Sequence, residues 1–193
     1  MSYDPAKHHR RSIRLQKYDY ASEGAYFVTI CTHNRECILG EIVEGEVRLS
    51  EIGTIAHQCW LEIPNHFKNV ALDEYVIMPN HVYGIIIIQP SMVGVQYIEP
   101  LREPQSNRFQ HITRRSIGSM IRSYKAAVTR QCDHASVGQF RWQRNYYEHV
   151  IRGEKDLNKT REYIIMNPLQ WFLDKENPSL LFPPFSVILP KKL

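Results

Sequence analysis

Two residues at the start of one predicted strand have side chains suited to phosphate chemistry. His81 opens the run His81-Val82-Tyr83-Gly84, which leads into four consecutive isoleucines. Residues two apart on a strand point to the same face, so His81 and Tyr83 are expected side by side. A histidine at both positions would form half of a metal site. The second position is instead Tyr83, and a neutral phenol with a pKa of about 10 is a poor magnesium ligand.

A second pair, Tyr163 and Asn167, is four residues apart in a segment with helical periodicity. Such residues share one face of a helix. A phenol can act as a covalent nucleophile toward phosphorus, and an amide oxygen can complete the shell of a hard divalent cation. From spacing alone, the favoured interpretation is still structural, with His81 hydrogen-bonded, Tyr163 in the core and Asn167 ending the helix.

A competing group lies upstream of Tyr163. Tyr146 and Tyr147 precede Glu148-His149, and Trp142 is close by in the sequence. Taken alone, this group looks more catalytic than Tyr163, so one of its tyrosines is also a candidate nucleophile. Trp142 could stack on a nucleobase, although a buried aromatic is the favoured interpretation.

The elements that must position these residues follow from periodicity and turn signals. Residues 52–63 have one apolar stripe, with Ser50 as the N-cap and Pro64 as the stop. The pattern predicts strands at 26–32, 41–43, 47–49, 70–78, 82–88 and, at an edge, 140–143, with further helices at 117–128 and 154–166. This order predicts an α+β fold, a ferredoxin-like antiparallel sheet covered by helices on one face.

The chain has 193 residues and a formal net charge of +4, and we divide it into an arm at 1–20, one domain at 21–175 and a tail at 176–193. An irregular insertion at about 90–112 interrupts the domain. The four cysteines lack zinc-knuckle or disulfide-framework spacing, so we expect reduced thiols. No signal peptide or membrane span is predicted, and we expect a cytoplasmic, nucleoid-associated protein.

Basic residues gather in the arm and after the insertion, a distribution that suits a polyanionic partner. They are Lys7, Arg10, Arg11, Arg14, Arg114, Arg115, Arg122 and Lys125.

The combined motifs resemble those of the REP-associated tyrosine transposases, a branch of the single-tyrosine HUH transposases. The motifs stand in the family's order between about Tyr18 and Trp171, in the stretches 24–29, 76–83, 115–125, 142–152 and 161–168. The resemblance implies a ferredoxin-like fold of the single-tyrosine HUH transposase type. It also implies metal-dependent cleavage and rejoining of single-stranded or hairpin DNA through a 5′-phosphotyrosine intermediate.

Carried over residue by residue, the resemblance makes Tyr163 the nucleophile and makes His81 and Asn167 ligands of Mg²⁺ or Mn²⁺. Tyr83 stands where the family has its second metal-binding histidine, so metal binding and cleavage are expected to be weakened. The basic residues named above are then candidates for the phosphate backbone of a DNA hairpin.

Three functions compete on these grounds. The first is a DNA strand transferase, with activity reduced by Tyr83. The second is a catalytically inactive hairpin-DNA-binding protein derived from such an enzyme. The third, an RNA-binding ferredoxin-like module, predicts exposed stacking aromatics on the central strands, where residues 85–88 are all isoleucine. Both a monomer and a homodimer are compatible with the sequence.

Overall fold

The structure is a computed structural model that describes residues 18–90, 115–138, 140–174 and 176–178. Two short 3-10 turns accompany the helices and strands, η1 at His33–Arg35 and η2 at Trp171–Leu173. In chain order the main elements are β1 (Gly24–Cys31), β2 (Gly40–Val43), β3 (Glu46–Leu49), α1 (Glu51–Leu61), α2 (Ile63–His66), β4 (Val70–Ile77), β5 (His81–Ile88), α3 (Ile117–Ala135), β6 (Tyr147–Ile151) and α4 (Glu154–Met166).

Four strands form one antiparallel sheet in the order β4-β5-β1-β6, while β2 and β3 form a separate hairpin. Helix α1 follows β1 and precedes β4, and α3 connects β5 to β6. This strand order with two crossover helices is the ferredoxin-like arrangement that the sequence predicts. Within it, Cys31 pairs with His81 and Thr29 pairs with Tyr83, so the start of β5 lies against the end of β1.

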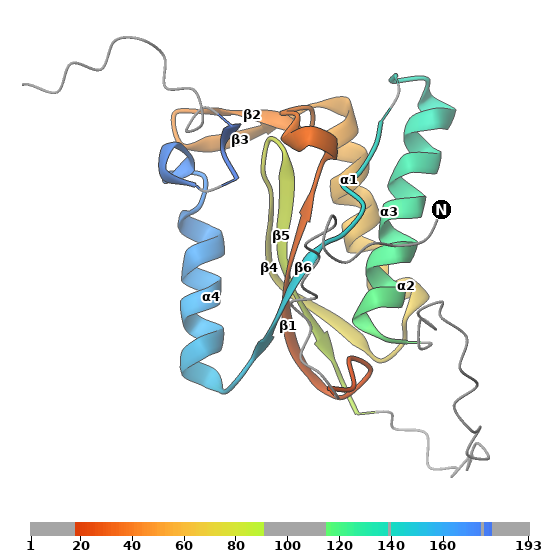
Figure 1. The fold of residues 1–193 in the computed structure, drawn as a ribbon, viewed down its shortest axis with the longest axis vertical. Coiled ribbons are helices and arrows are strands. Elements are labelled where there is room, and N and C mark those ends of the chain that lie inside the picture. The colour runs from red at the N-terminus through yellow and green to blue at the C-terminus, as the bar shows by residue number, and fades with distance from the viewer. Residues whose placement is uncertain (1–17, 91–114, 139, 175, 179–193) are drawn as a thin grey trace, which may run out of the picture.

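Helices cover both faces of this sheet (Figure 1). Val28, Val82 and Ile86 belong to the cluster that packs against α1 and α3. Their neighbours Tyr83 and Ile85 point the other way and pack with Ile164 of α4. The expectation of helices on one face was therefore wrong. Because β1 and β5 carry apolar side chains on both faces, each face requires a cover, and α4 supplies the second one.

The local signals placed most of the elements correctly. The Ser50 hydroxyl accepts a hydrogen bond from the Gly53 amide at 3.0 Å and caps α1 as expected. Helix α1 ends at Leu61, and Pro64 lies in the short helix α2. The fourth sheet strand is β6 rather than the expected 140–143 strand, which contributes only the bridge between Thr32 and Trp142.

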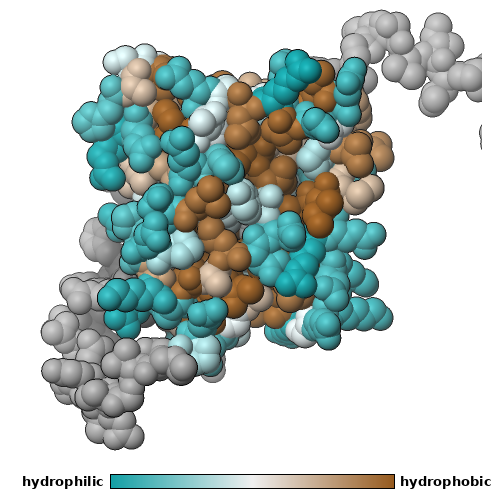
Figure 2. All heavy atoms as spheres, turned by 180° about the vertical axis from the view of Figure 1, so that it is seen from behind, coloured by the Kyte–Doolittle hydropathy of each residue, from teal (hydrophilic) through white to brown (hydrophobic). Residues whose placement is uncertain are grey.

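The surface is mixed in character. Figure 2 shows apolar patches separated by hydrophilic residues on the rear face. Large exposed apolar side chains are concentrated at the end of α4 and on η2, namely Ile165, Met166, Leu169, Phe172 and Leu173. Within the described ranges, no helix combines the length and the apolar character needed to cross a membrane.

Gly84 allows β5 and α1 to approach closely. A Cβ atom built at this position would collide with the ring of Trp60, which is fully buried. We therefore expect Gly84→Ala to lower the free energy of unfolding by about 1–3 kcal/mol, measured by denaturant titration. Adding Trp60→Phe should recover part of that loss, because the smaller ring leaves room for the methyl group. Equal stability of Gly84→Ala and the wild type would contradict this packing.

Candidate active site

Helix α4 holds Tyr163 at the edge of a buried cluster. The side chain of Ile164 is buried against the sheet, whereas Tyr163 beside it is 39% exposed. Arg161, two residues earlier, makes a two-pronged ion pair with Asp73 of β4, with Nε to Oδ1 at 2.7 Å and Nη2 to Oδ2 at 2.6 Å. Apolar packing and a bidentate ion pair therefore fix the turn of α4 that carries Tyr163.

The Arg161–Asp73 ion pair predicts a pH-dependent stability. The hydrogen bond from Arg161 lowers the pKa of Asp73 below its ordinary value. A group with a lowered folded-state pKa stabilises the fold above its unfolded pKa of about 3.9 and loses that contribution as pH falls through the folded value. Asp73→Asn should therefore lower the melting temperature at pH 7, and lower it by less at pH 3, which is below the unfolded pKa of Asp73. The same difference at both pH values would contradict this role.

Tyr163 is the exposed end of a hydrogen-bonded chain. Its hydroxyl donates to the hydroxyl of Tyr83 at 3.0 Å. The Tyr83 hydroxyl in turn donates to the carboxylate of Asp174, with its closer contact to Oδ2 at 3.3 Å. Burial, and then the hydrogen bond with Tyr163, raise the pKa of Tyr83 well above its ordinary value. Tyr83 therefore stays a neutral phenol and acts as a hydrogen-bonding partner of Tyr163.

Asn167 reaches the same carboxylate from the end of α4. Its Nδ2 donates to Asp174 Oδ2 at 2.6 Å. Its Oδ1 is buried and has no hydrogen-bond partner among the described residues. As the sequence predicts, Tyr163 and Asn167 lie on one side of α4. The Asp174 carboxylate connects them, because it accepts hydrogen bonds from Asn167 and from Tyr83, the partner of Tyr163.

His81 lies next to Tyr83, with ring centroids 4.1 Å apart. The Nδ1 atom of His81 is 2.8 Å from Oδ1 of Asn80. Asn80 is oriented by its Nδ2, which donates to the carbonyls of Arg35 at 3.0 Å and Glu176 at 2.7 Å. Because this orientation makes Oδ1 the acceptor, Nδ1 of His81 must donate, and the lone pair of the neutral ring is on Nε2.

Sequence reasoning missed Asp174, Glu176 and Asn80. Asp174 and Glu176 follow η2 in a stretch without periodicity, so no pattern marks them as site residues. Both are buried, and Glu176 forms an ion pair with Arg35 at 3.0 Å. Asn80 lies between the expected strands at 70–78 and 82–88, where periodicity does not mark a site residue.

These residues fit a divalent cation only in part. The unpartnered Asn167 oxygen and the Nε2 lone pair of His81 suit such an ion. The protonated phenol of Tyr83 does not. Within the described ranges, no group of three or more His, Cys, Asp or Glu side chains is arranged to hold a metal. A cation here would take most of its ligands from phosphate oxygens and water, as Mg²⁺ often does.

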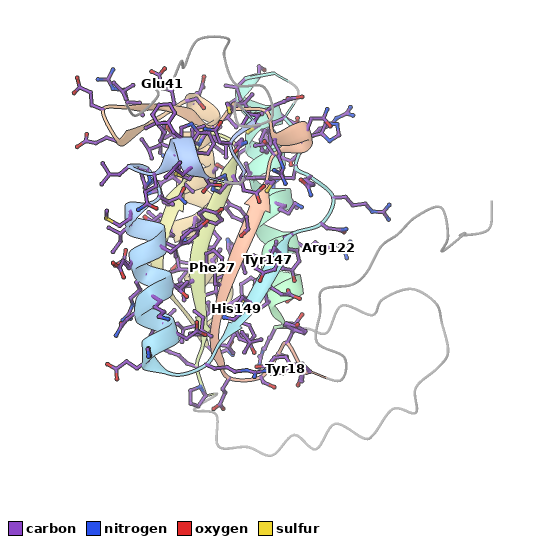
Figure 3. The ribbon with its side chains drawn as sticks, turned by 60° about the vertical axis from the view of Figure 1, so that its left-hand side comes forward. Tyr18, Phe27, Glu41, Arg122, Tyr147 and His149 are labelled. Atoms are coloured by element: carbon purple, nitrogen blue, oxygen red, sulfur yellow. The ribbon has the colours of Figure 1, made fainter. Side chains whose placement is uncertain are left out.

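The candidate DNA-binding residues have different environments. Lys7, Arg10, Arg11, Arg14 and Arg114 lie outside the described residues. Arg115 and Arg122 are exposed near the start of α3, and Figure 3 shows Arg122 on the α3 side of the sheet. Lys125 is different, because its Nζ donates to the carbonyl of Gln143 at 2.5 Å and burial lowers its pKa to about 8.

The alternative nucleophile, Tyr147, lies on β6. Thr29 pairs with both Tyr83 and Tyr147, so the three residues form one row across the sheet. Tyr147 is 37% exposed, almost the same as Tyr163. Figure 3 shows Tyr147 and His149 on the strands between α3 and α4. The nearest carboxylate partner of His149 is Asp156 of α4, at 3.0 Å.

Comparison with known proteins gives one close relative in sequence. No protein-family model matches the chain. A Haemophilus influenzae protein described as uncharacterized is 45% identical over 173 residues, which cover 90% of this chain and 96% of that protein. The chain belongs to the family of this Haemophilus protein.

Solved structures resemble the fold of this chain. A REP-associated tyrosine transposase, solved with a REP hairpin bound, matches with a TM-score of 0.53 and 18% identity, covering 84% of this chain and 77% of that chain. A candidate transposase from Deinococcus radiodurans gives a TM-score of 0.42 and 16% identity, covering 80% and 96%. The first match confirms the predicted fold class, a ferredoxin-like antiparallel sheet, which this chain shares with that transposase.

Proposed function

We propose that this chain is a DNA strand transferase that cleaves and rejoins single-stranded or hairpin DNA, with Tyr163 as the nucleophile. The observation that carries the proposal is the position of Tyr163. The residue is 39% exposed, and its hydroxyl donates a hydrogen bond to Tyr83. His81 and Asn167 lie next to the same chain of contacts. The fold is shared with a transposase whose structure contains a REP hairpin.

In the proposed reaction, the Tyr163 oxygen bonds to phosphorus as the bond from phosphorus to the 3′ oxygen breaks. The proton that the phenol gives up is balanced by one that the departing 3′ oxygen gains, so the products are a 5′-phosphotyrosine and a free 3′-hydroxyl. The covalent bond conserves the phosphodiester energy, and attack by a 3′-hydroxyl reverses the step. A bound Mg²⁺ or Mn²⁺ would polarise a phosphate oxygen, with His81 and Asn167 as its protein ligands.

DNA binding would rely on cations that contact the phosphate backbone. Arg115 and Arg122 are exposed and available for such contacts. Lys125 is better suited to holding the 143–145 loop, since its ammonium group already has carbonyl partners there. Loss of a single phosphate contact should weaken binding to all sequences similarly and reduce its salt dependence.

One observation favours a second function, a catalytically inactive hairpin-binding protein. Tyr83 replaces the histidine that the resemblance calls for, and it is fully buried with hydrogen bonds on both sides of its hydroxyl. A side chain so well packed stabilises the fold without binding a metal. Under this function the chain recognises a hairpin and leaves it intact.

The test is a gel assay with labelled hairpins taken from the DNA that flanks the gene, in the presence of Mg²⁺ or Mn²⁺. A strand transferase yields a covalent protein–DNA species together with a 3′-hydroxyl that a polymerase can extend. An inactive binding protein shifts the same hairpins without forming that species. Binding to hairpins that is no tighter than binding to unstructured DNA or duplex would contradict both functions.

A further inference from the structure

Asp174 is a buried carboxylate for which neither the sequence nor the comparisons supply a role. Asp174 is only 5% exposed. It forms no ion pair with Lys, Arg or His among the residues that the structure describes. Three donors replace a counter-ion: the Tyr83 hydroxyl, Asn167 Nδ2 at 2.6 Å and the Glu176 amide at 2.6 Å. Burying an unpaired carboxylate is costly, and these hydrogen bonds offset the cost.

The carboxylate determines the direction of the hydrogen bonds that lead to Tyr163. An ionised carboxylate can only accept, so the hydroxyl of Tyr83 must donate to Asp174. Having used its proton there, the Tyr83 oxygen faces Tyr163 as an acceptor, and Tyr163 donates to it. The proton of Tyr163 is therefore used in the bond to Tyr83, and the lone pairs of its oxygen are not used in that bond.

The segment that carries Asp174 is attached to the sheet at several points. Arg35 pairs with the Glu176 carboxylate at 3.0 Å, and Asn80 donates to the Glu176 carbonyl at 2.7 Å. Asn177 donates to the Trp171 carbonyl at 2.9 Å. These contacts come from η1, from the turn between β4 and β5, and from η2. They hold the carboxylate in place relative to β5, which carries Tyr83.

We propose that Asp174 is a positioning residue that fixes the direction of the Tyr163–Tyr83 hydrogen bond and thereby turns the lone pairs of the Tyr163 oxygen toward the substrate. The proposal rests on the function proposed above, because it assigns Asp174 a role in aiming the same nucleophile. Asp174 acts through Tyr83 and makes no contact with the substrate. The Tyr83 hydroxyl then links Asp174 to Tyr163, at the position where the resemblance calls for the second histidine.

A first test measures the hydrogen bond without any reaction. The protein is labelled with ¹³Cζ-tyrosine, and the Tyr163 resonance is identified among the 11 tyrosines by its absence in Tyr163→Phe. Asp174→Asn, whose amide can donate to Tyr83, should shift this resonance. In a Tyr83→Phe background the same substitution should leave it unmoved. The proposal would be overturned if Asp174→Asn leaves the Tyr163 resonance unshifted, or if it shifts that resonance equally in the wild-type and Tyr83→Phe backgrounds.

A second test follows the single-turnover rate of adduct formation at saturating hairpin. Asp174→Asn should slow it by about tenfold or more while changing hairpin affinity less than about twofold, since positioning acts on the reacting geometry. In the Tyr83→Phe background the further loss should be less than about threefold, because the two changes break one chain. Equal losses in both backgrounds would mean a general structural role and would overturn the proposal.

A control variant and a substitute variant complete both tests. Asp133→Asn, at an exposed aspartate of α3, is the matched control and should alter neither readout. If Asp174→Asn does not fold, Tyr83→Phe alone must still shift the Tyr163 resonance and slow the reaction, and its failure to do so overturns the proposal. If the wild type forms no adduct, the proposed function fails, and the resonance experiment alone decides the role of Asp174.

Discussion

Tyr163→Phe is expected to abolish the covalent protein–DNA adduct, with a loss of at least about 1,000-fold, because it removes the only atom that can bond to phosphorus at this position. The ring should stay in place, since its contacts with Phe27 and Tyr83, at centroid distances of 6.2 and 5.3 Å, involve the aromatic faces and edges. Hairpin affinity should therefore be retained. The measurement is adduct yield on a denaturing gel, with binding measured in parallel.

Tyr147→Phe is the matched control for this experiment. It removes the same atom from a tyrosine of nearly equal exposure on the same face of the sheet. Adduct formation should continue in this variant. If Tyr147→Phe loses the adduct while Tyr163→Phe still forms it, the nucleophile is Tyr147 on β6, and the proposed site is contradicted.

Tyr83→His is expected to tighten Mn²⁺ binding by about tenfold or more, which is the scale on which ligands and their partners alter metal affinity. The new imidazole would lie beside His81, where the rings of residues 81 and 83 are now 4.1 Å apart. Two adjacent imidazoles and the Asn167 oxygen make a far better set of ligands than one imidazole and an amide. Isothermal titration calorimetry with Mn²⁺ and no DNA measures the change.

Tyr83→Phe is the control for the metal experiment, because it removes the hydroxyl without adding a ligand. Its Mn²⁺ affinity should match that of the wild type. If Tyr83→His and Tyr83→Phe bind Mn²⁺ equally weakly, position 83 does not face a metal site, and the interpretation of His81 and Asn167 as ligands fails with it.

Much of the scaffold could be predicted because its signals are local. Residues 82–88 were predicted as a strand, and the structure shows β5 there as a central strand of the sheet. Ser50 predicted the start of α1, and periodicity predicted α4 at Glu154–Met166, the bounds that the structure shows. Such elements depend on caps and apolar spacing within one segment.

The errors concern long-range choices. Strand β6 alternates only weakly between exposed and half-buried residues, so its Tyr-Tyr-Glu-His sequence looked more like a catalytic group than a strand. The face that α4 covers depends on which side of the sheet remained open. No local pattern encodes that choice.

In the candidate site, too, local signals could be predicted and long-range contacts could not. His81, Tyr83, Tyr163 and Asn167 were found from spacing and resemblance, and the structure brings them together around one chain of contacts. Asp174 completes that chain from a position 91 residues after Tyr83. Only the folded structure brings these two residues together, so sequence spacing could not identify Asp174.

The most direct measurement is to identify the residue that becomes linked to DNA. Wild-type protein is incubated with a labelled hairpin and Mn²⁺, digested with trypsin and nuclease, and analysed by mass spectrometry. We expect a nucleotide phosphate on Tyr163, in the tryptic peptide spanning residues 162–175. A modification in the peptide spanning 145–152, which contains Tyr147, would contradict it, as would cleaved DNA with no protein-linked nucleotide.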